Sequence, residues 1–132
     1  MLPACTSTFG YPRSQLGGSI QGTELSLSTA VTTLAGSSSG NTDATGTSAR
    51  FNQPMGITTD GTNLYVVDYG NNRIRKIVIS TGVVTTLAGG SSSGNTDATG
   101  TSASFYKPMG ITTDGTNLYD ADSHNHRIRK IE

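Results

Sequence analysis

The sequence of 132 residues lacks most of the features that point directly to a particular chemistry or compartment. It has a single cysteine, Cys5, so no disulfide can form within the chain. It has no tryptophan, and no run approaches the roughly 20 apolar residues that cross a bilayer. Nine basic and nine acidic residues cancel. A neutral chain lacks the general attraction of a basic domain for nucleic acid or anionic lipid, so we expect neither partner and no transmembrane segment.

What the chain does have is a long internal repeat. Residues 37–77 align with residues 91–131 at a shift of 54 positions, and 33 of the 41 aligned positions are identical. The eight differences are Arg50/Ser104, Asn52/Tyr106, Gln53/Lys107, Val66/Asp120, Val67/Ala121, Tyr69/Ser123, Gly70/His124 and Asn72/His126. A period of this size is typical of solenoids, propellers and arrays, in which one unit cannot bury its apolar faces alone.

One complete repeat reads as four short strands. We predict them at Met55–Thr59, Leu64–Asp68, Arg73–Ser80 and Val83–Ala88. The Asp60-Gly61 step between the first two is a strong hairpin signal. In the third strand Ile74 alternates with Arg73 and Arg75, the pattern of a half-exposed strand. Four antiparallel strands with local connections and a long onward link describe a β-propeller blade.

The rest of the chain supplies further strands. Val31–Ala35 repeats the sequence that ends the fourth strand, and Met109–Ile131 contains only the first three strands of the next unit. We therefore expect an all-β fold that contains the strands of two propeller blades. The order of these strands is permuted, so that the N-terminal strand completes a blade. Leu25–Ser28 is a possible pairing partner of that strand. The expected organisation is an N-terminal segment at 1–23 and blades over 24–132: a closing strand at 31–35, a complete blade at 51–88 and three strands at 105–131.

The N-terminal segment has no match to the repeat. Met1–Cys5 is similar to the end of a bacterial lipoprotein signal, in which a small residue precedes the lipidated cysteine, but the preceding apolar region is missing. Cys5 is therefore either a free thiol or the remnant of such a signal. The second alternative would place the parent protein in an extracellular or periplasmic compartment, anchored as a lipoprotein through this cysteine.

The order of residues within the repeat resembles the NHL repeat. The resemblance rests on Asp43, Gly46, Ala49-x-Phe51-x-x-Pro54-x-Gly56-Ile57, Asp60-Gly61, Asn63-Leu64-Tyr65-Val66-Val67-Asp68 and Asn71-Asn72-Arg73-Ile74-Arg75-Lys76-Ile77, and it recurs from Asp97 to Ile131. It implies β-propellers, mostly six-bladed, whose members mostly act as binding platforms for proteins, RNA or glycans, while some related propellers are metal-dependent enzymes. Structural roles account for most of the signature. Gly56 and Gly110 would allow close backbone approach, Asp68 and Asp122 would cap the next turn, and Phe51 and Phe105 would fill the gap between blades.

Two blades cannot close a ring, because their outer faces and terminal edges would stay open. We expect the chain either to self-associate, most simply as a trimer that gives six blades, or to have covalent neighbours in a longer array. Asp120 complicates both alternatives, because it places a carboxylate where the first copy has the apolar Val66 on a strand expected to be buried.

Two patterns suggest metal sites only weakly. Asp120, Asp122, His124 and His126 alternate along the chain, but they span a strand end and a turn where alternation fails. The segment Asn41-x-Asp43-x-Thr45-Gly46 is similar to the start of a calcium loop, but no glutamate stands at the twelfth position. Turn and loop roles are the simpler interpretation, so we expect no metal and no cofactor.

The basic residues and the histidines do not indicate catalysis or RNA binding. A basic stripe recurs in both copies: Arg73, Arg75, Lys76, Arg127, Arg129 and Lys130. It lacks the aromatic residues that RNA readers use for stacking, so we expect solvated charges or pairs with loop aspartates. Both histidines lie in one turn, and no nucleophile with its base can be assembled. We therefore expect no enzymatic activity.

The sequence favours a non-enzymatic module that presents a repeated loop face to a protein or glycan. The expected binding residues are Asp43, Tyr69, Asn71, Asn72, Asp97, Ser123, His124, Asn125 and His126. Five of the differences between the copies fall in or beside these connections: at Arg50, Asn52, Tyr69, Gly70 and Asn72. The alternatives are a purely structural array within a secreted or cell-surface protein, or part of a metal-dependent enzyme whose metal residues lie in other blades.

Overall fold

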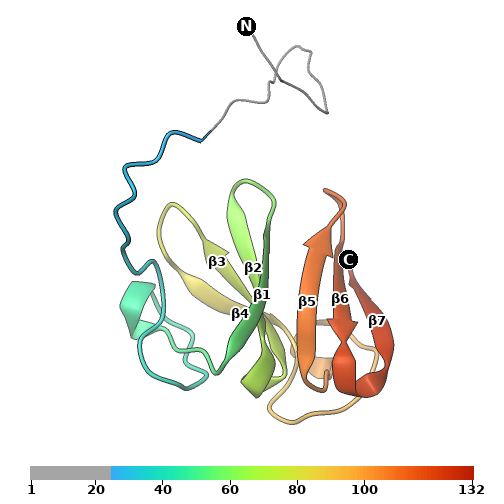
Figure 1. Ribbon diagram of the computed structural model, residues 1–132. Helices are drawn as coiled ribbons and strands as arrows, with labels where there is room; N and C mark the ends of the chain where they lie inside the picture. The colour runs from blue at the N-terminus through green and yellow to red at the C-terminus, as the bar shows by residue number, and fades with distance from the viewer. Residues whose placement is uncertain (1–24) are drawn as a thin grey trace, which may run out of the picture. The chain divides into compact units, whose positions relative to one another are not determined.

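The computed structural model describes residues 25–132 (Figure 1). The predictions for the N-terminal segment at 1–23, Cys5 included, lie outside these residues. The chain divides into two units, Met1–Thr32 and Thr33–Glu132. In the first unit, residues 25–32 are exposed and have no regular secondary structure.

The second unit contains two antiparallel sheets that follow one another along the chain. The first sheet has the order β1-β2-β3-β4, with β1 at Pro54–Thr59, β2 at Asn63–Asp68, β3 at Arg73–Val78 and β4 at Val84–Ala88. The second has the order β5-β6-β7, with β5 at Pro108–Thr113, β6 at Leu118–Asp122 and β7 at Arg127–Ile131. Four short 3-10 turns complete it: η1 (Gly46–Ser48), η2 (Tyr69–Asn71), η3 (Gly100–Ser102) and η4 (Ser123–Asn125). The prediction of one four-stranded and one three-stranded blade is confirmed.

The hairpin turns form for the reasons that the sequence suggests. The Asp60 carboxylate accepts hydrogen bonds from the backbone N–H groups of Asn63 at 2.7 Å and Thr62 at 2.9 Å. These bonds hold the pKa of Asp60 well below its usual value, with a further contribution from the Tyr65 hydroxyl. Strand β3 ends at Val78, earlier than predicted, because the Gly82 N–H already closes a turn onto the Val78 carbonyl at 2.7 Å.

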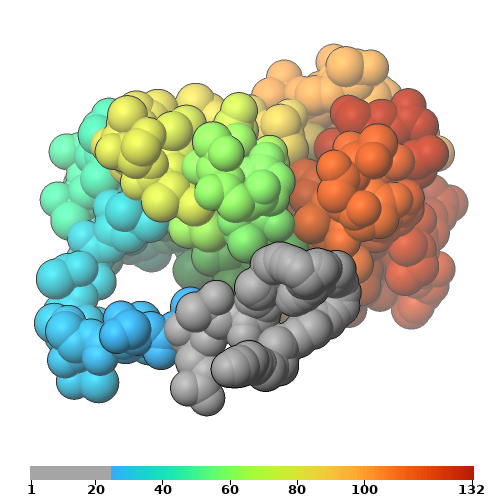
Figure 2. All heavy atoms as spheres, turned by 90° about the horizontal axis from the view of Figure 1, so that it is seen from above, coloured from blue at the N-terminus to red at the C-terminus, as the bar shows by residue number. Residues whose placement is uncertain are grey.

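The two sheets pack face to face as adjacent blades. Strand β1 lies beside β5, and Figure 2 shows the first blade, in green and yellow, directly against the second, in orange and red. Gly56 makes this approach possible: a Cβ atom there would lie 2.7 Å from the Met109 carbonyl oxygen. A Cβ on Gly110, the same position in the second blade, would meet nothing within 4 Å. The predicted close approach therefore occurs at Gly56, where a next blade exists within the chain.

Two apolar clusters lie on opposite faces of the first sheet. The inter-blade cluster consists of Val67, Ile74, Ala88, Ala103 and Phe105. The outer cluster consists of Ala49, Val66, Ile77 and Val84, with Ala35, Ala44, Phe51 and Leu64 packed against it. Neighbouring residues of β2 thus point into different clusters, as expected for a strand between two layers. Phe105, 2% exposed, fills the gap between the blades as predicted.

The segment Val31–Ala35, which repeats the sequence of the fourth strand, pairs with no strand in the described structure. Within residues 25–132, neither Val31–Ala35 nor Leu25–Ser28 is a strand, so the suggested pairing of these two segments is wrong. A strand needs the hydrogen-bonding edge of another strand, and no strand pairs with this segment in the described structure. A role for Val31–Ala35 as a closing strand stays a prediction. No helix long and apolar enough to span a membrane occurs among the described residues.

Candidate functional site

A buried arginine holds the long link of the first blade onto its sheet. Arg75 on β3 is 0% exposed. Its Nη1 donates to Asp68 Oδ2 at 2.7 Å and to the Arg50 carbonyl at 2.8 Å. Its Nη2 donates to Asp43 Oδ1 at 2.7 Å and to the Thr42 carbonyl at 3.0 Å. The half-exposed pattern predicted for β3 is therefore wrong at Arg75, because partners far away in the sequence compensate its buried charge.

The second blade repeats this arrangement. Arg129 donates to Asp122 Oδ2 at 2.7 Å and to Asp97 Oδ1 at 2.8 Å. Its guanidinium carbon lies 4.9 Å from the centroid of the Phe105 ring, as Arg75 lies over Phe51 in the first blade. These two arginine–aspartate clusters remove one cation per blade from the surface, so the basic stripe is not continuous.

The asparagines of the 3-10 turns belong to the same clusters. Asn71 Nδ2 donates to Asp68 Oδ2 and to the Gly40 carbonyl, both at 2.7 Å. Asn125 makes the equivalent two bonds, to Asp122 and the Gly94 carbonyl. Asp68 and Asp122 make no capping bond to the turns that follow them, contrary to expectation, because their oxygens accept from these amides and from the arginines.

The structure divides the nine predicted binding residues into three sets. Asp43, Asn71, Asp97 and Asn125 hold the links within each blade, although Asp97 is also 88% exposed. Asn72 joins the two blades, because its Oδ1 accepts from the Lys107 N–H at 2.8 Å. The other four, which lie in or just after η2 and η4, are Tyr69, Ser123, His124 and His126. Ligand binding by any of the nine stays a prediction.

Two residues outside the predicted set contact Tyr69 and His124, two members of the third set. Lys107 Nζ lies 4.8 Å from the centroid of the Tyr69 ring, across the boundary between the blades. The rings of Tyr106 and His124 lie 4.9 Å apart at an interplanar angle of 54°. We call Tyr69, Tyr106, Lys107 and His124 the loop-end patch. Tyr106 and Lys107 could have been found from sequence, because both differ from their counterparts in the first copy.

Two of the differences between the copies are sterically coupled. In the first blade a Cβ on Gly70 would lie 2.5 Å from Asn52 Cγ, so no side chain fits there. In the second blade these positions hold His124 and Tyr106, whose rings are in contact. The first blade therefore has the pair Asn52 and Gly70, and the second blade has Tyr106 and His124 at the equivalent positions. In each blade the two residues of the pair fit against each other.

The structure gives no support to the suggested metal ligands as a group. Asp120 and Asp122 are both 0% exposed, whereas His124 and His126 are exposed. No group of three histidine, cysteine or acidic side chains suited to a metal occurs in the described range. The carboxylate of Asp43, from the suggested calcium loop, is bound by Arg75 and by Thr86.

Asp120 is the least satisfied group among these residues. Neither of its carboxylate oxygens has a hydrogen-bond partner, although both are buried. Burial raises the pKa of Asp120 to about 7, with a further contribution from the Asp122 carboxylate and an opposing one from Arg129. The first copy has Val66 here, inside the outer cluster.

The stacked sheets, one of four strands and one of three, and their repeated arginine–aspartate clusters define a repeat protein built from propeller blades. No family model matches the chain. NHL repeat-containing protein 2 of Bos taurus is 37% identical over 98 residues, which cover 70% of this chain and 14% of that protein. The chain belongs to the NHL-repeat family. It spans about a seventh of the length of this relative.

Two solved structures from Bacteroides resemble the fold. An auxiliary nutrient binding protein from Bacteroides ovatus matches with a TM-score of 0.66 and 28% identity, over 75% of this chain and 28% of that one. A candidate phosphatase from Bacteroides thetaiotaomicron matches with a TM-score of 0.63 and 29% identity, over 71% of this chain and 24% of that one. Similar blades thus occur in proteins described by different functions.

Proposed function

We propose that this chain is a non-enzymatic NHL-repeat module that binds a protein segment or a glycan through the loop-end patch. One observation carries the proposal: the differences between the two copies collect at this end of the blades. Five of the eight differing pairs supply or adjoin the patch: Asn52/Tyr106, Gln53/Lys107, Tyr69/Ser123, Gly70/His124 and Asn72/His126. The residues of the arginine–aspartate clusters are identical in both copies. The side chains that hold each link onto its sheet are therefore the same in both copies, whereas the neighbouring surface residues differ.

The chemistry of the patch suits such ligands. Two tyrosine rings and an imidazole offer apolar faces for a sugar ring or an aliphatic side chain, and Lys107 adds a cation beside Tyr69. Tyrosine is also enriched where proteins bind proteins, because it supplies contact area at a low cost in conformational entropy. The Bacteroides ovatus neighbour is described as an auxiliary nutrient binding protein, which supports a binding role. The fold alone does not decide the role, as the candidate phosphatase shows.

The proposal includes the absence of catalysis, self-association into a closed ring, and a location outside the cytoplasm. In the patch, the ring of His124 packs against the ring of Tyr106, which supports a role in contact and not in catalysis. Near-identical copies support self-association, because every blade interface in a ring would be nearly the same. The similarity of Met1–Cys5 to a lipoprotein signal, together with the nutrient-binding neighbour, supports the location.

The test is a screen of peptides and glycans against the chain and against a triple variant: Tyr106→Asn, Lys107→Gln and His124→Gly. These changes give the second blade the residues of the first, which are compatible with the fold there. Ala121→Val is the matched control, because it is also an exchange between copies but lies outside the patch.

We expect the triple variant to lose at least about tenfold in affinity, or roughly 1.4 kcal/mol, while the control binds as the parent chain does. Equal binding by both variants would exclude the patch as the site. A folded chain that binds nothing in the screen would favour the purely structural array.

A further inference from the structure

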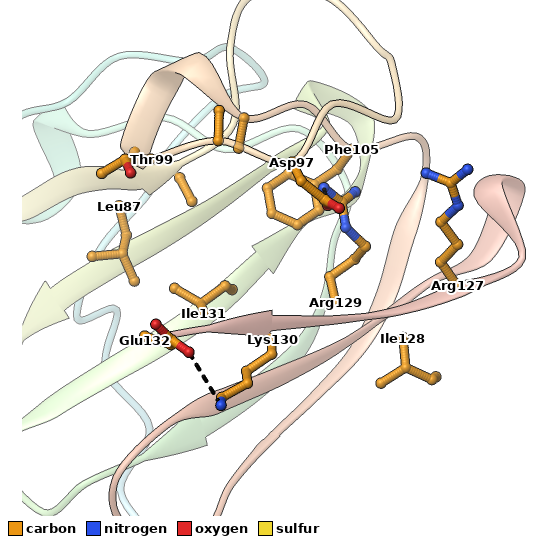
Figure 3. A pocket seen from close by; sticks show the side chains of 14 residues that line it. Leu87, Asp97, Thr99, Phe105, Arg127, Ile128, Arg129, Lys130, Ile131 and Glu132 are labelled. Carbon is orange, nitrogen blue, oxygen red and sulfur yellow. Dashed lines mark hydrogen bonds and ion pairs between the residues drawn. The ribbon is translucent and has the colours of Figure 1, made fainter.

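Asp120 lies on the face of the second sheet that is turned toward the first blade. It stands opposite Ile111 of β5 and Arg129 of β7. Residues that face each other across antiparallel strands share one side of the sheet, and Ile111 packs against the inter-blade cluster. Ile131 packs against the same cluster, and Figure 3 shows Arg129 and Ile131 on the same side of β7. Asp120, which is 0% exposed, is therefore buried at the boundary between the two blades.

The first blade offers this carboxylate no compensating charge. Toward the second blade it presents the inter-blade cluster, whose side chains are apolar. The titratable side chains on that side of β2 and β3 are Tyr65 and Lys76, which pair with each other nearer the first hairpin turn. The charges that act on Asp120 come from its own sheet, where the Asp122 carboxylate opposes its ionisation and the Arg129 guanidinium favours it.

The Arg129 guanidinium is already engaged by other partners. Its two terminal nitrogens donate to Asp122, to Asp97 of the link between the blades and to two backbone carbonyls of that link. Neither oxygen of Asp120 has a hydrogen-bond partner among the described residues. An ionised carboxylate in such a place is strongly destabilised until water or a donor reaches it. Protonation of Asp120 therefore favours the packed blades, and its ionisation opposes them.

The loop-end patch depends on the same boundary, because its residues come from both blades. Lys107 of the second blade lies over the ring of Tyr69, which belongs to the first. The Lys107 N–H also donates to Asn72 Oδ1 of the first blade at 2.8 Å. Within the second blade, Asp122 Oδ1 accepts from the Tyr106 N–H at 2.8 Å. Separation of the blades would break the first two contacts and take the patch apart.

We propose that the packing of the second blade on the first, and with it the loop-end patch, is controlled by protonation of Asp120. The boundary is closed and the patch is assembled while the carboxyl group is neutral. When the group is ionised, water enters the boundary and the blades separate locally. The first copy has Val66 at this position, so the device belongs to this one boundary of the two blades. The inference concerns the regulation of the proposed binding site and rests on the proposed function.

The pH range of the change follows from the environment of Asp120. Burial raises its pKa from 3.8 to about 7 in the packed state, whereas water restores the ordinary value when the blades separate. Because the packed state has the higher pKa, the packed state is favoured below pH 7 and loses this advantage as the pH rises through that value. A rise from pH 6 to pH 8 should increase the equilibrium constant for opening by about tenfold.

The test is amide hydrogen exchange of the chain at pH 6 and pH 8, corrected for the intrinsic rates. The Lys107 N–H reports on the boundary, because Asn72 of the other blade holds it. The amides paired between β2 and β3 report on the first blade alone. Asp120→Val introduces the residue of the first copy, and Asp120→Asn removes the charge while keeping the shape. The matched control is His124→Gln with His126→Asn, which removes both histidines of the chain.

We expect the Lys107 amide to exchange through a local opening whose equilibrium constant rises about tenfold from pH 6 to pH 8. The histidine variant should keep this rise, and both Asp120 variants should abolish it. Equal protection of the Lys107 amide and the β2–β3 amides would overturn the inference, because the blades would then separate only when the whole chain unfolds. A rise that persists in both Asp120 variants, or that disappears with the histidines, would overturn it as well.

The ligand screen is run in parallel at pH 6, where the boundary is closed. A chain that shows the expected exchange but binds nothing would overturn the proposed function and leave the proton-dependent boundary intact. A chain that binds a ligand through the patch, with exchange of Lys107 that does not depend on pH, would overturn the control by Asp120 and leave the proposed function intact.

Discussion

Replacement of Asp120 by valine should stabilise the protein, and the gain should depend on pH. Asp120 is 0% exposed on β6, and both carboxylate oxygens lack a hydrogen-bond partner. Its position corresponds to Val66, which is 6% exposed in the first blade, so a valine matches what the same strand position holds there. The substitution therefore removes an unsatisfied buried group and introduces a side chain that the repeat already accommodates.

The size of the effect follows from the pKa. Burial raises the pKa of Asp120 from 3.8 to about 7. Each pKa unit corresponds to about 1.4 kcal/mol, so full ionisation in the folded protein costs about 4 kcal/mol relative to the unfolded chain. Because the folded-state pKa is the higher one, the contribution of Asp120 to stability is most favourable below pH 4. This contribution falls as the pH rises toward 7 and is least favourable above that value.

Urea denaturation of the parent chain and of Asp120→Val at pH 4, 6 and 8 measures this dependence. We expect the parent chain to lose a few kcal/mol of unfolding free energy across this range and the variant to lose much less. Asp120→Asn should also flatten the profile but gain less stability, because its amide is neutral and still unsatisfied. A variant less stable than the parent chain at pH 8, or a parent profile that neither substitution changes, would refute this reasoning.

Two further substitutions test the frame of the blades. Arg75→Met should destabilise the chain by about 3–5 kcal/mol, because it leaves the buried carboxylate of Asp68 without its cation. Lys76→Met on the same strand is the control, and equal urea midpoints for the two would contradict the assigned role of Arg75. Gly56→Ala should cost about 1–3 kcal/mol, because its Cβ would lie 2.7 Å from the Met109 carbonyl oxygen. Gly110→Ala, with nothing within 4 Å, should change the stability of the dissociated chain by less than about 0.5 kcal/mol, and thermal unfolding at low concentration would reveal any larger effect.

The loop-end patch could be predicted only in part from the sequence. Tyr69 and His124 could be proposed from the connections in which they lie, whereas the sequence marks Tyr106 and Lys107 only by their difference from Asn52 and Gln53. Lys107 reaches Tyr69 only because the second blade packs against the first. Asp43 and Asn71 are polar loop residues of the kind that bind ligands, yet their side chains form hydrogen bonds that hold the link within the blade.

The sequence by itself determined the order and approximate limits of the seven strands in the two sheets, because apolar alternation, Asp-Gly turns and the repeat act over a few residues at a time. It also showed that Val31–Ala35 has the sequence of a fourth strand. Only the tertiary structure decided that Arg75 is buried, since the groups that compensate its charge, such as Asp43, lie far from it along the chain. The structure likewise decided that Asp120 is buried without a hydrogen-bond partner. Burial and pairing depend on segments brought together from distant parts of the chain, which a local pattern does not encode.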